Sequence, residues 1–176
     1  MKYITLLRGI NVGGKRKVEM RKLKNLFEND GHTNVTTYLN SGNVLFESNT
    51  KRETLQKEVP KKLEKEFGFE IPTLIKTEKE IKEIAKAIPR NWKYDSEQYT
   101  QIAYLFPEID SRKTMDEFPV KKEFIKMKYI KGAIIWNIKK ENYNKSHLNY
   151  MFNLKLYQRM TVRNVHTAKF LAGNKK

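Results

Sequence analysis

The chain has 176 residues, no cysteine, and 36 Lys and Arg against 20 Asp and Glu, which gives a formal net charge of +16. The absence of cysteine excludes disulfides, thiol nucleophiles and cysteine-ligated zinc. No apolar run approaches the ~18 residues that a membrane span requires. We therefore expect a cytoplasmic protein without a membrane span, and nothing in the composition indicates a metal or another cofactor.

The first half of the chain predicts a β-α-β-β-α-β order. Stretches rich in β-branched and aromatic residues indicate strands at residues 3–7, 35–39, 44–46 and 71–75. Apolar residues on one face indicate two helices between them, carried by Met20, Leu23, Leu26 and Phe27 and by Leu55, Val59, Leu63 and Phe67. The short segment between the second and third strands indicates a hairpin. This order is that of a ferredoxin-like unit.

The second half repeats the plan. A short helix over residues 81–88 ends before Pro89. We then expect strands at residues 101–106, 123–129, 133–138 and 157–162, and helices at 111–118, at 146–154 and at the end, to Ala172. The predicted fold class is α+β, with tandem ferredoxin-like subdomains built on antiparallel sheets. The predicted boundaries are a first subdomain at 1–88, a linker at 89–99 and a second subdomain at 100–176, related to the first by duplication.

The segment from Gly9 to Lys15 fits the pattern G-x-x-x-x-G-K, which begins a phosphate-binding loop. In such loops the next residue is Ser or Thr, which holds magnesium, and here it is Arg16. The following helix is expected to begin only near Glu19. The sequence thus argues against a magnesium-dependent nucleotide triphosphatase. Two interpretations remain: a metal-free anion site with a basic rim, or a flexible connection whose glycines supply positive φ.

The positive charge is uneven, because residues 121–176 carry 14 Lys and Arg against two acidic residues. Such a field attracts phosphate polymers and small polyanions. Only eight of the basic residues are Arg, however, and a Lys-rich solvated surface is the competing explanation. The predicted strands also lack the paired aromatic platforms of an RNA recognition module.

Histidine and carboxylate chemistry has little support in the sequence. His32, His147 and His166 are the only histidines, and none has the spacing of a metal-ligand pair.

Near the C-terminus, Asn164 is placed to cap the last helix, and Arg163 beside that helix start forms another corner suited to an anion.

Three stretches together resemble a known bacterial family, the domain of unknown function 1697. They are LLRGINVGGK from Leu6, TYLNSGNVLF from Thr37, and the T-x-R-N-x-x-T pattern from Thr161. The family usually carries Trp after Arg-Asn, where this chain has Val165. The resemblance implies a two-part ferredoxin-like α+β fold and no known activity. The candidate anion-binding residues at these motifs and their basic rim are Arg8, Asn11, Gly13, Gly14, Lys15, Ser41, Gly42, Asn43, Arg163 and Asn164.

We expect the protein to bind an anionic partner, either nucleic acid or a phosphorylated small molecule. In the more specific form of this hypothesis, the glycine loop, the Ser41–Asn43 turn and Arg163-Asn164 form one anion pocket. The alternatives are an enzyme that acts on a small phosphorylated or nucleotide substrate, and a self-associating structural module.

Overall fold

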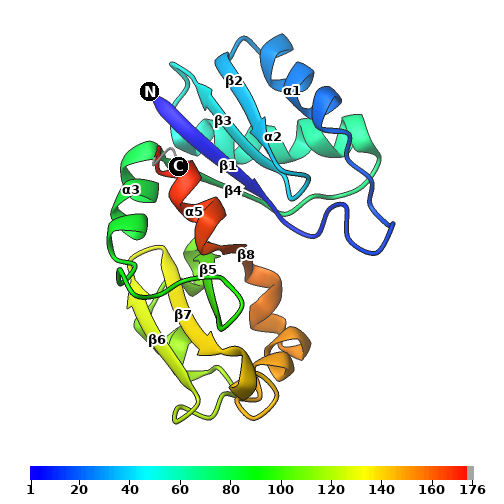
Figure 1. Ribbon diagram of the computed structural model, residues 1–176. Helices are drawn as coiled ribbons and strands as arrows, with labels where there is room; N and C mark the ends of the chain where they lie inside the picture. The colour runs from blue at the N-terminus through cyan, green and yellow to red at the C-terminus, as the bar shows by residue number, and fades with distance from the viewer. Residues whose placement is uncertain (174–176) are drawn as a thin grey trace. The chain divides into compact units, whose positions relative to one another are not determined.

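A computed structural model describes residues 1–173, and its contacts divide the chain into two units, residues 1–79 and the remainder from Glu80 (Figure 1). Helix α3 (Glu78–Lys86) begins next to this division. The division comes nine residues before the boundary that the sequence predicted. Residues 87–97 form neither helix nor strand, and β5 begins at Gln98.

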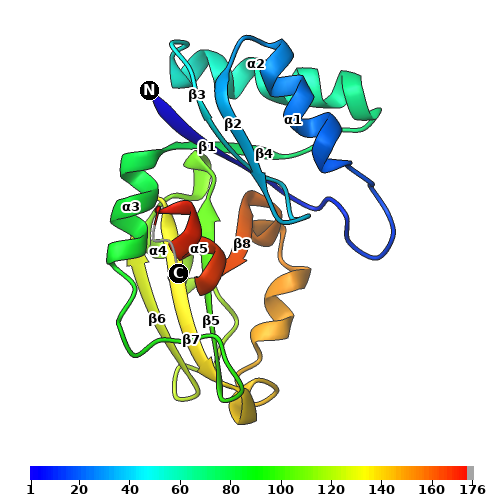
Figure 2. The ribbon, with the colours of Figure 1, turned by 45° about the horizontal axis from the view of Figure 1, so that its top comes forward.

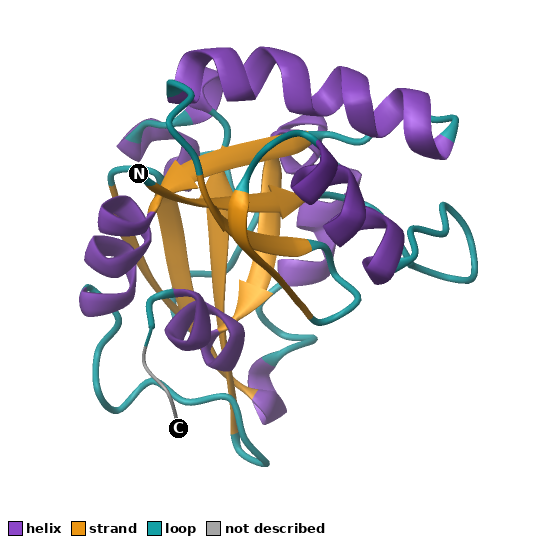
Figure 3. Ribbon diagram, turned by 90° about the horizontal axis from the view of Figure 1, so that it is seen from above, coloured by secondary structure: helices purple, strands orange, loops and turns teal. Residues whose placement is uncertain are grey.

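The first unit is one antiparallel sheet with two helices on one face. Its strands are in the order β2-β3-β1-β4 and comprise β1 (Lys2–Leu7), β2 (Thr33–Tyr38), β3 (Asn43–Glu47) and β4 (Thr73–Thr77). The helices α1 (Met20–Asn29) and α2 (Arg52–Phe67) pack against this sheet in one core, and Figure 3 shows the long helix α2 beside the strands. The two predicted apolar stripes are confirmed, because the core contains Leu23, Phe27, Leu55, Val59 and Leu63. Gly68 at φ 78° ends α2 in the left-handed conformation.

The second unit repeats the strand order of the first. Its sheet has the order β6-β7-β5-β8 and is formed by β5 (Gln98–Leu105), β6 (Ile125–Ile130), β7 (Ala133–Lys139) and β8 (Met160–Asn164). The short helices are η1 (Pro107–Ile109), α4 (Arg112–Asp116) and α5 (Val165–Leu171). The tandem ferredoxin-like α+β fold is thereby confirmed, and so is the hairpin between β6 and β7.

One predicted helix takes a different form. The segment between β7 and β8 contains three 3₁₀ helices, η2 (Lys140–Asn142), η3 (Leu148–Asn153) and η4 (Lys155–Arg159). Two buried apolar residues, Leu148 and Met151, are three residues apart, which matches the three-residue turn of a 3₁₀ helix. In Figure 2 this orange segment lies beside β8. Strand β8 therefore begins at Met160 instead of residue 157.

None of the helices in residues 1–173 combines the length and the apolar character that crossing a bilayer requires.

Candidate functional site

The glycine loop folds as a tight hairpin that projects from the end of β1 (Figure 1). The backbone N–H of Lys15 donates to the Val12 carbonyl over 3.1 Å, and the backbone N–H of Asn11 donates to the Arg16 carbonyl over 3.1 Å. Gly13 and Gly14, at the two central positions, have φ of 59° and 73°. Positive φ at both central positions of a turn favours glycine, because a Cβ atom is strained there. The loop is thus a solvent-exposed turn, which differs from a phosphate-binding loop that leads directly into a helix.

Asn11 anchors the base of this hairpin through its side chain. The amide nitrogen donates to the carbonyls of Val18 and Asn40, each over 2.9 Å. The amide oxygen accepts from the Val18 backbone N–H over 2.8 Å. Asn11 therefore joins the glycine hairpin, the segment that leads into α1, and the turn between β2 and β3. Two of the three predicted motif stretches are brought together in this way.

Arg16 fastens the other side of the hairpin. Its guanidinium donates to the Glu70 carbonyl and lies 5.0 Å from the centroid of the Phe69 ring. The side chain at the position where a phosphate loop carries Ser or Thr is therefore bound to the segment between α2 and β4. This contact gives a structural reason for the departure from the phosphate-loop pattern.

An open surface pocket of about 770 Å³ lies between the glycine hairpin and the start of α1. We call it the hairpin pocket, and its walls are Asn11, Gly14, Lys17, Val18, Glu19, Met20, Arg21, Lys22, Asn40 and Phe67. Lys17, Arg21 and Lys22 are exposed cations, and Glu19 is the one acidic residue among the lining residues. Glu19 makes no side-chain cap, so the first amides of α1 lack a side-chain acceptor from it.

The Ser41–Asn43 turn supports this pocket without lining it. Asn43 is fully buried, and its amide nitrogen donates to the Tyr38 carbonyl over 2.7 Å and to Ser41 Oγ over 3.1 Å. The Leu7 amide donates to the Gly42 carbonyl over 2.8 Å. These contacts close the turn and hold it against the end of β1. Of the predicted site residues, only Asn11 and Gly14 line the hairpin pocket.

Arg163 and Asn164 belong to the second unit. Arg163 is 7% exposed and donates to Thr161 Oγ1 and to the Val162 carbonyl, each over 2.9 Å. Burial lowers the pKa of Arg163 to about 10, while the Tyr104 and Tyr157 hydroxyls act in the opposite direction, so the side chain stays charged at neutral pH. Asn164 Oδ1 accepts from the Thr167 amide over 2.9 Å, which confirms it as the cap of the last helix. Whether either residue binds a ligand stays a prediction.

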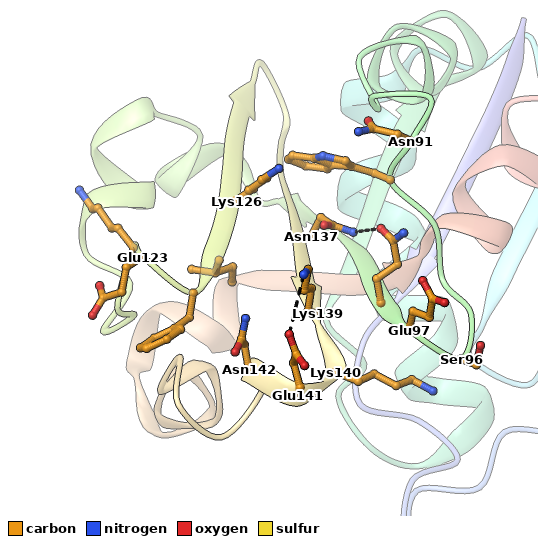
Figure 4. Close-up of a pocket in the computed structure, with 15 residues that line it drawn as sticks. Asn91, Ser96, Glu97, Glu123, Lys126, Asn137, Lys139, Lys140, Glu141 and Asn142 are labelled. Carbon is orange, nitrogen blue, oxygen red and sulfur yellow. Dashed lines mark hydrogen bonds and ion pairs between the residues drawn. The ribbon is translucent and has the colours of Figure 1, made fainter.

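The second unit also carries an open groove of about 880 Å³ (Figure 4). Four lysines line it, but so do three glutamates. Lys139 pairs with Glu141 at 3.8 Å, and Asn137 donates to Gln98 Oε1 over 2.6 Å, as the dashed lines in Figure 4 mark. Because the charges nearly balance, this groove is less suited to an anion than the hairpin pocket.

Residues 1–173 contain no cluster of three or more His, Asp or Glu side chains that could hold a metal ion. His32 lies instead in the core of the first unit, with its ring 4.8 Å from the Phe46 ring and 5.9 Å from the Phe27 ring. Its Nε2 is 3.3 Å from Asp30 Oδ2.

We expect the stability of the first unit to fall as the pH drops below about 6.5, the ordinary pKa of histidine. Burial lowers the pKa of His32, Asp30 acts against this shift, and Lys62 acts with it. A folded-state pKa below the unfolded one means that the unfolded chain takes up the proton first on acidification. Denaturation of the wild type and of His32→Gln between pH 8 and pH 5 checks this. The difference in unfolding free energy between them should shrink toward acid pH, and a pH-independent difference would contradict the assignment.

The comparisons with known proteins give a family match and a structural match. A family model described as "Protein of unknown function (DUF1697)" matches residues 1–136. The chain is similar to the solved structure of the conserved bacterial protein SP0830 from Streptococcus pneumoniae, with 25% sequence identity and a TM-score of 0.84. That alignment covers 99% of this chain and 98% of the other. No curated protein matches the chain.

Proposed function

We propose that this protein, which belongs to the DUF1697 family, binds a phosphate-bearing anion in the hairpin pocket. The family description itself names no activity. The observation that carries the proposal is the local charge. Residues 8–24 contain seven Lys and Arg and one acidic residue, a net charge of +6. This equals the net charge of the whole first unit, so the remaining residues of that unit balance to zero.

The geometry of the pocket supports a small ligand or one unit of a polymer. A volume of about 770 Å³ lies within the roughly 300–1,000 Å³ of small-molecule sites. Arg21 and Lys22 stand in the first turn of α1, where the helix dipole and the free amides also favour a negative charge. The cationic side chains and the helix start therefore act on the same region of the pocket. We propose the cytoplasm as the location, and the enzyme and self-association alternatives stay predictions.

The test is ligand-dependent thermal stability with three probes: inorganic phosphate, ribose 5-phosphate and a short single-stranded oligonucleotide. A ligand at about 100 times its Kd should add about 2.7 kcal/mol to the free energy of unfolding. The double variant Arg21→Glu and Lys22→Glu should weaken binding of the probe about tenfold or more, because each charge-assisted hydrogen bond contributes ~1.5–3 kcal/mol.

The matched control is Lys57→Glu with Lys61→Glu, which makes the same charge change at exposed positions of α2 outside the pocket. If both double variants lose the response equally, the effect is one of net charge and the pocket assignment fails. Binding of the oligonucleotide should also fall with salt, with a slope near −0.7 per phosphate contact for a single strand. No response to any of the three probes at low salt would refute the proposal.

A further inference from the structure

The second unit has another open pocket, of about 620 Å³, which differs in chemistry from the hairpin pocket. Half of its lining residues are aromatic, and we call it the aromatic pocket. The lining residues are Tyr94, Tyr99, Gln101, Trp136, Lys140, Tyr143, Asn144, Leu148, Met151, Phe152, Tyr157 and Val162. All of them lie in the unit that begins at Glu80.

The sheet supplies the floor of this pocket. Gln101 of β5 is the register partner of Trp136 of β7, and Val162 of β8 is the partner of Ala103. Residues 101 and 103 point to the same face of β5 because side chains alternate along a strand. Gln101, Trp136 and Val162 are therefore displayed on one face of the sheet. The Gln101 amide gives this floor both a hydrogen-bond donor and an acceptor.

The aromatic side chains form two groups of contacting rings. Tyr99 lies 5.1 Å from Tyr94 and 6.1 Å from Tyr143, measured between ring centroids. The second group is Phe152 and Tyr157, whose centroids are 5.0 Å apart. Rings at these spacings interact favourably with one another and present further faces and edges to a planar guest.

The exposure of the Phe152 side chain is a second, independent indication that the aromatic pocket binds a guest. The exposed aromatic residues in the described part of the chain are Tyr150, at 51%, and Phe152, at 50%, and both belong to η3. A ring left half in water forgoes part of the free energy that full burial would give. Phe152 lines the aromatic pocket, whereas Tyr150 does not. A guest ring in the pocket would cover the exposed face of Phe152.

One cation stands at the pocket. Lys140 lines both the aromatic pocket and the open groove, and its Nζ lies 4.7 Å from the centroid of the Tyr99 ring. In Figure 4, Lys139 and Lys140 point in different directions from the end of β7. An ammonium group next to aromatic rings and side-chain amides matches a nucleotide, whose base stacks on such rings and whose phosphate carries negative charge.

From these observations we propose that the aromatic pocket binds an unpaired nucleobase by stacking, with Lys140 placed for an adjoining phosphate. The sources of such a base are a free nucleoside or nucleotide, and a single-stranded nucleic acid. This site uses other residues than the hairpin pocket and does not depend on the function proposed for it.

The experiment uses Trp136 as the reporter. Of the two tryptophans, Trp136 lines the aromatic pocket and Trp92 lines the open groove. In a Trp92→Phe background, adenosine and AMP should quench Trp136 fluorescence, and ribose 5-phosphate, which has no base, should not. Phe152→Ala should weaken binding of adenosine roughly 5- to 150-fold, the effect of removing one stacking partner. Tyr150→Ala, equally exposed in the same 3₁₀ helix, should leave it within about twofold.

Lys140→Ala should weaken AMP more than adenosine. A short oligodeoxyadenylate that binds more tightly than AMP identifies a strand as the source of the base, and equal affinity identifies the free nucleotide. No quenching by adenosine or AMP, or equal losses in Phe152→Ala and Tyr150→Ala, would overturn the inference. The hairpin pocket is tested separately by thermal stability. If ribose 5-phosphate stabilises the protein and Arg21→Glu with Lys22→Glu abolishes this stabilisation, the function of the hairpin pocket stands in either case.

Discussion

Replacing Gly42 by alanine is expected to lower the free energy of unfolding by about 2–5 kcal/mol. The left-handed conformation of an L-residue costs ~1–2 kcal/mol, and overpacking adds ~1–3 kcal/mol. Gly42 has φ +75°, and a Cβ atom there would lie 2.7 Å from both Ile10 Cδ1 and Leu7 Cβ. Those two residues belong to the end of β1 and the start of the glycine loop, so relief requires movement of the segment that carries the hairpin pocket.

Gly9→Ala is the matched control, because Gly9 has a similar φ of +68° but no atom within 4 Å of the added Cβ. Only the backbone strain is then expected, about 1–2 kcal/mol. Urea denaturation of both variants, followed by circular dichroism, measures the difference. Equal losses would mean that the turn does not pack as closely against β1 as these distances require.

Replacing Asn11 by alanine should have the next largest effect, a loss of about 1.5–4.5 kcal/mol if each of its three hydrogen bonds contributes ~0.5–1.5 kcal/mol. Its amide links the segment before α1 to the Asn40 carbonyl, and its φ of 55° is one that asparagine tolerates better than alanine. The hairpin pocket should become less ordered, so its response to phosphate-bearing probes should weaken as well.

Asn40→Ala is the control for this variant, because Asn40 contributes its backbone carbonyl to the contact and its side chain is exposed. We expect a change within about 0.5 kcal/mol. Asn11→Asp adds a sharper test, since a carboxylate keeps the acceptor for the Val18 amide but cannot donate to the two carbonyls. Thermal and urea denaturation together decide the result. If Asn11→Asp is as stable as the wild type, the two donated bonds contribute nothing.

Local signals in the sequence were sufficient where periodicity and residue chemistry act over short distances. The apolar stripe of α1 and its start beside Glu19 agree with the structure. The capping role of Asn164 depends on a bond to an amide three residues away, and it was predictable for the same reason. The segment over residues 146–154 was predicted to be helical, but its 3₁₀ form was not, because Leu148 and Met151, three residues apart, fit either type of helix.

The candidate sites needed more than local signals. Arg21 and Lys22 were missed, although the concentration of charge in residues 8–24 is visible in the sequence. The aromatic pocket has no such signal, because its rings are spread from Tyr94 to Tyr157 over the segment before β5, the strands β5 and β7, and the 3₁₀ segment.

The sequence by itself determined the order of the elements and the tandem ferredoxin-like plan, and it argued against a magnesium-type phosphate loop. Those properties depend on the period of the apolar residues and on single side chains such as Arg16. The tertiary structure alone decided that the glycine segment is a hairpin held in place by hydrogen bonds of Asn11 and Arg16. It also decided that the Asn43 side chain is hydrogen-bonded within its own turn. Hydrogen bonds between residues far apart in the chain select these arrangements, and a local pattern carries no information about such partners.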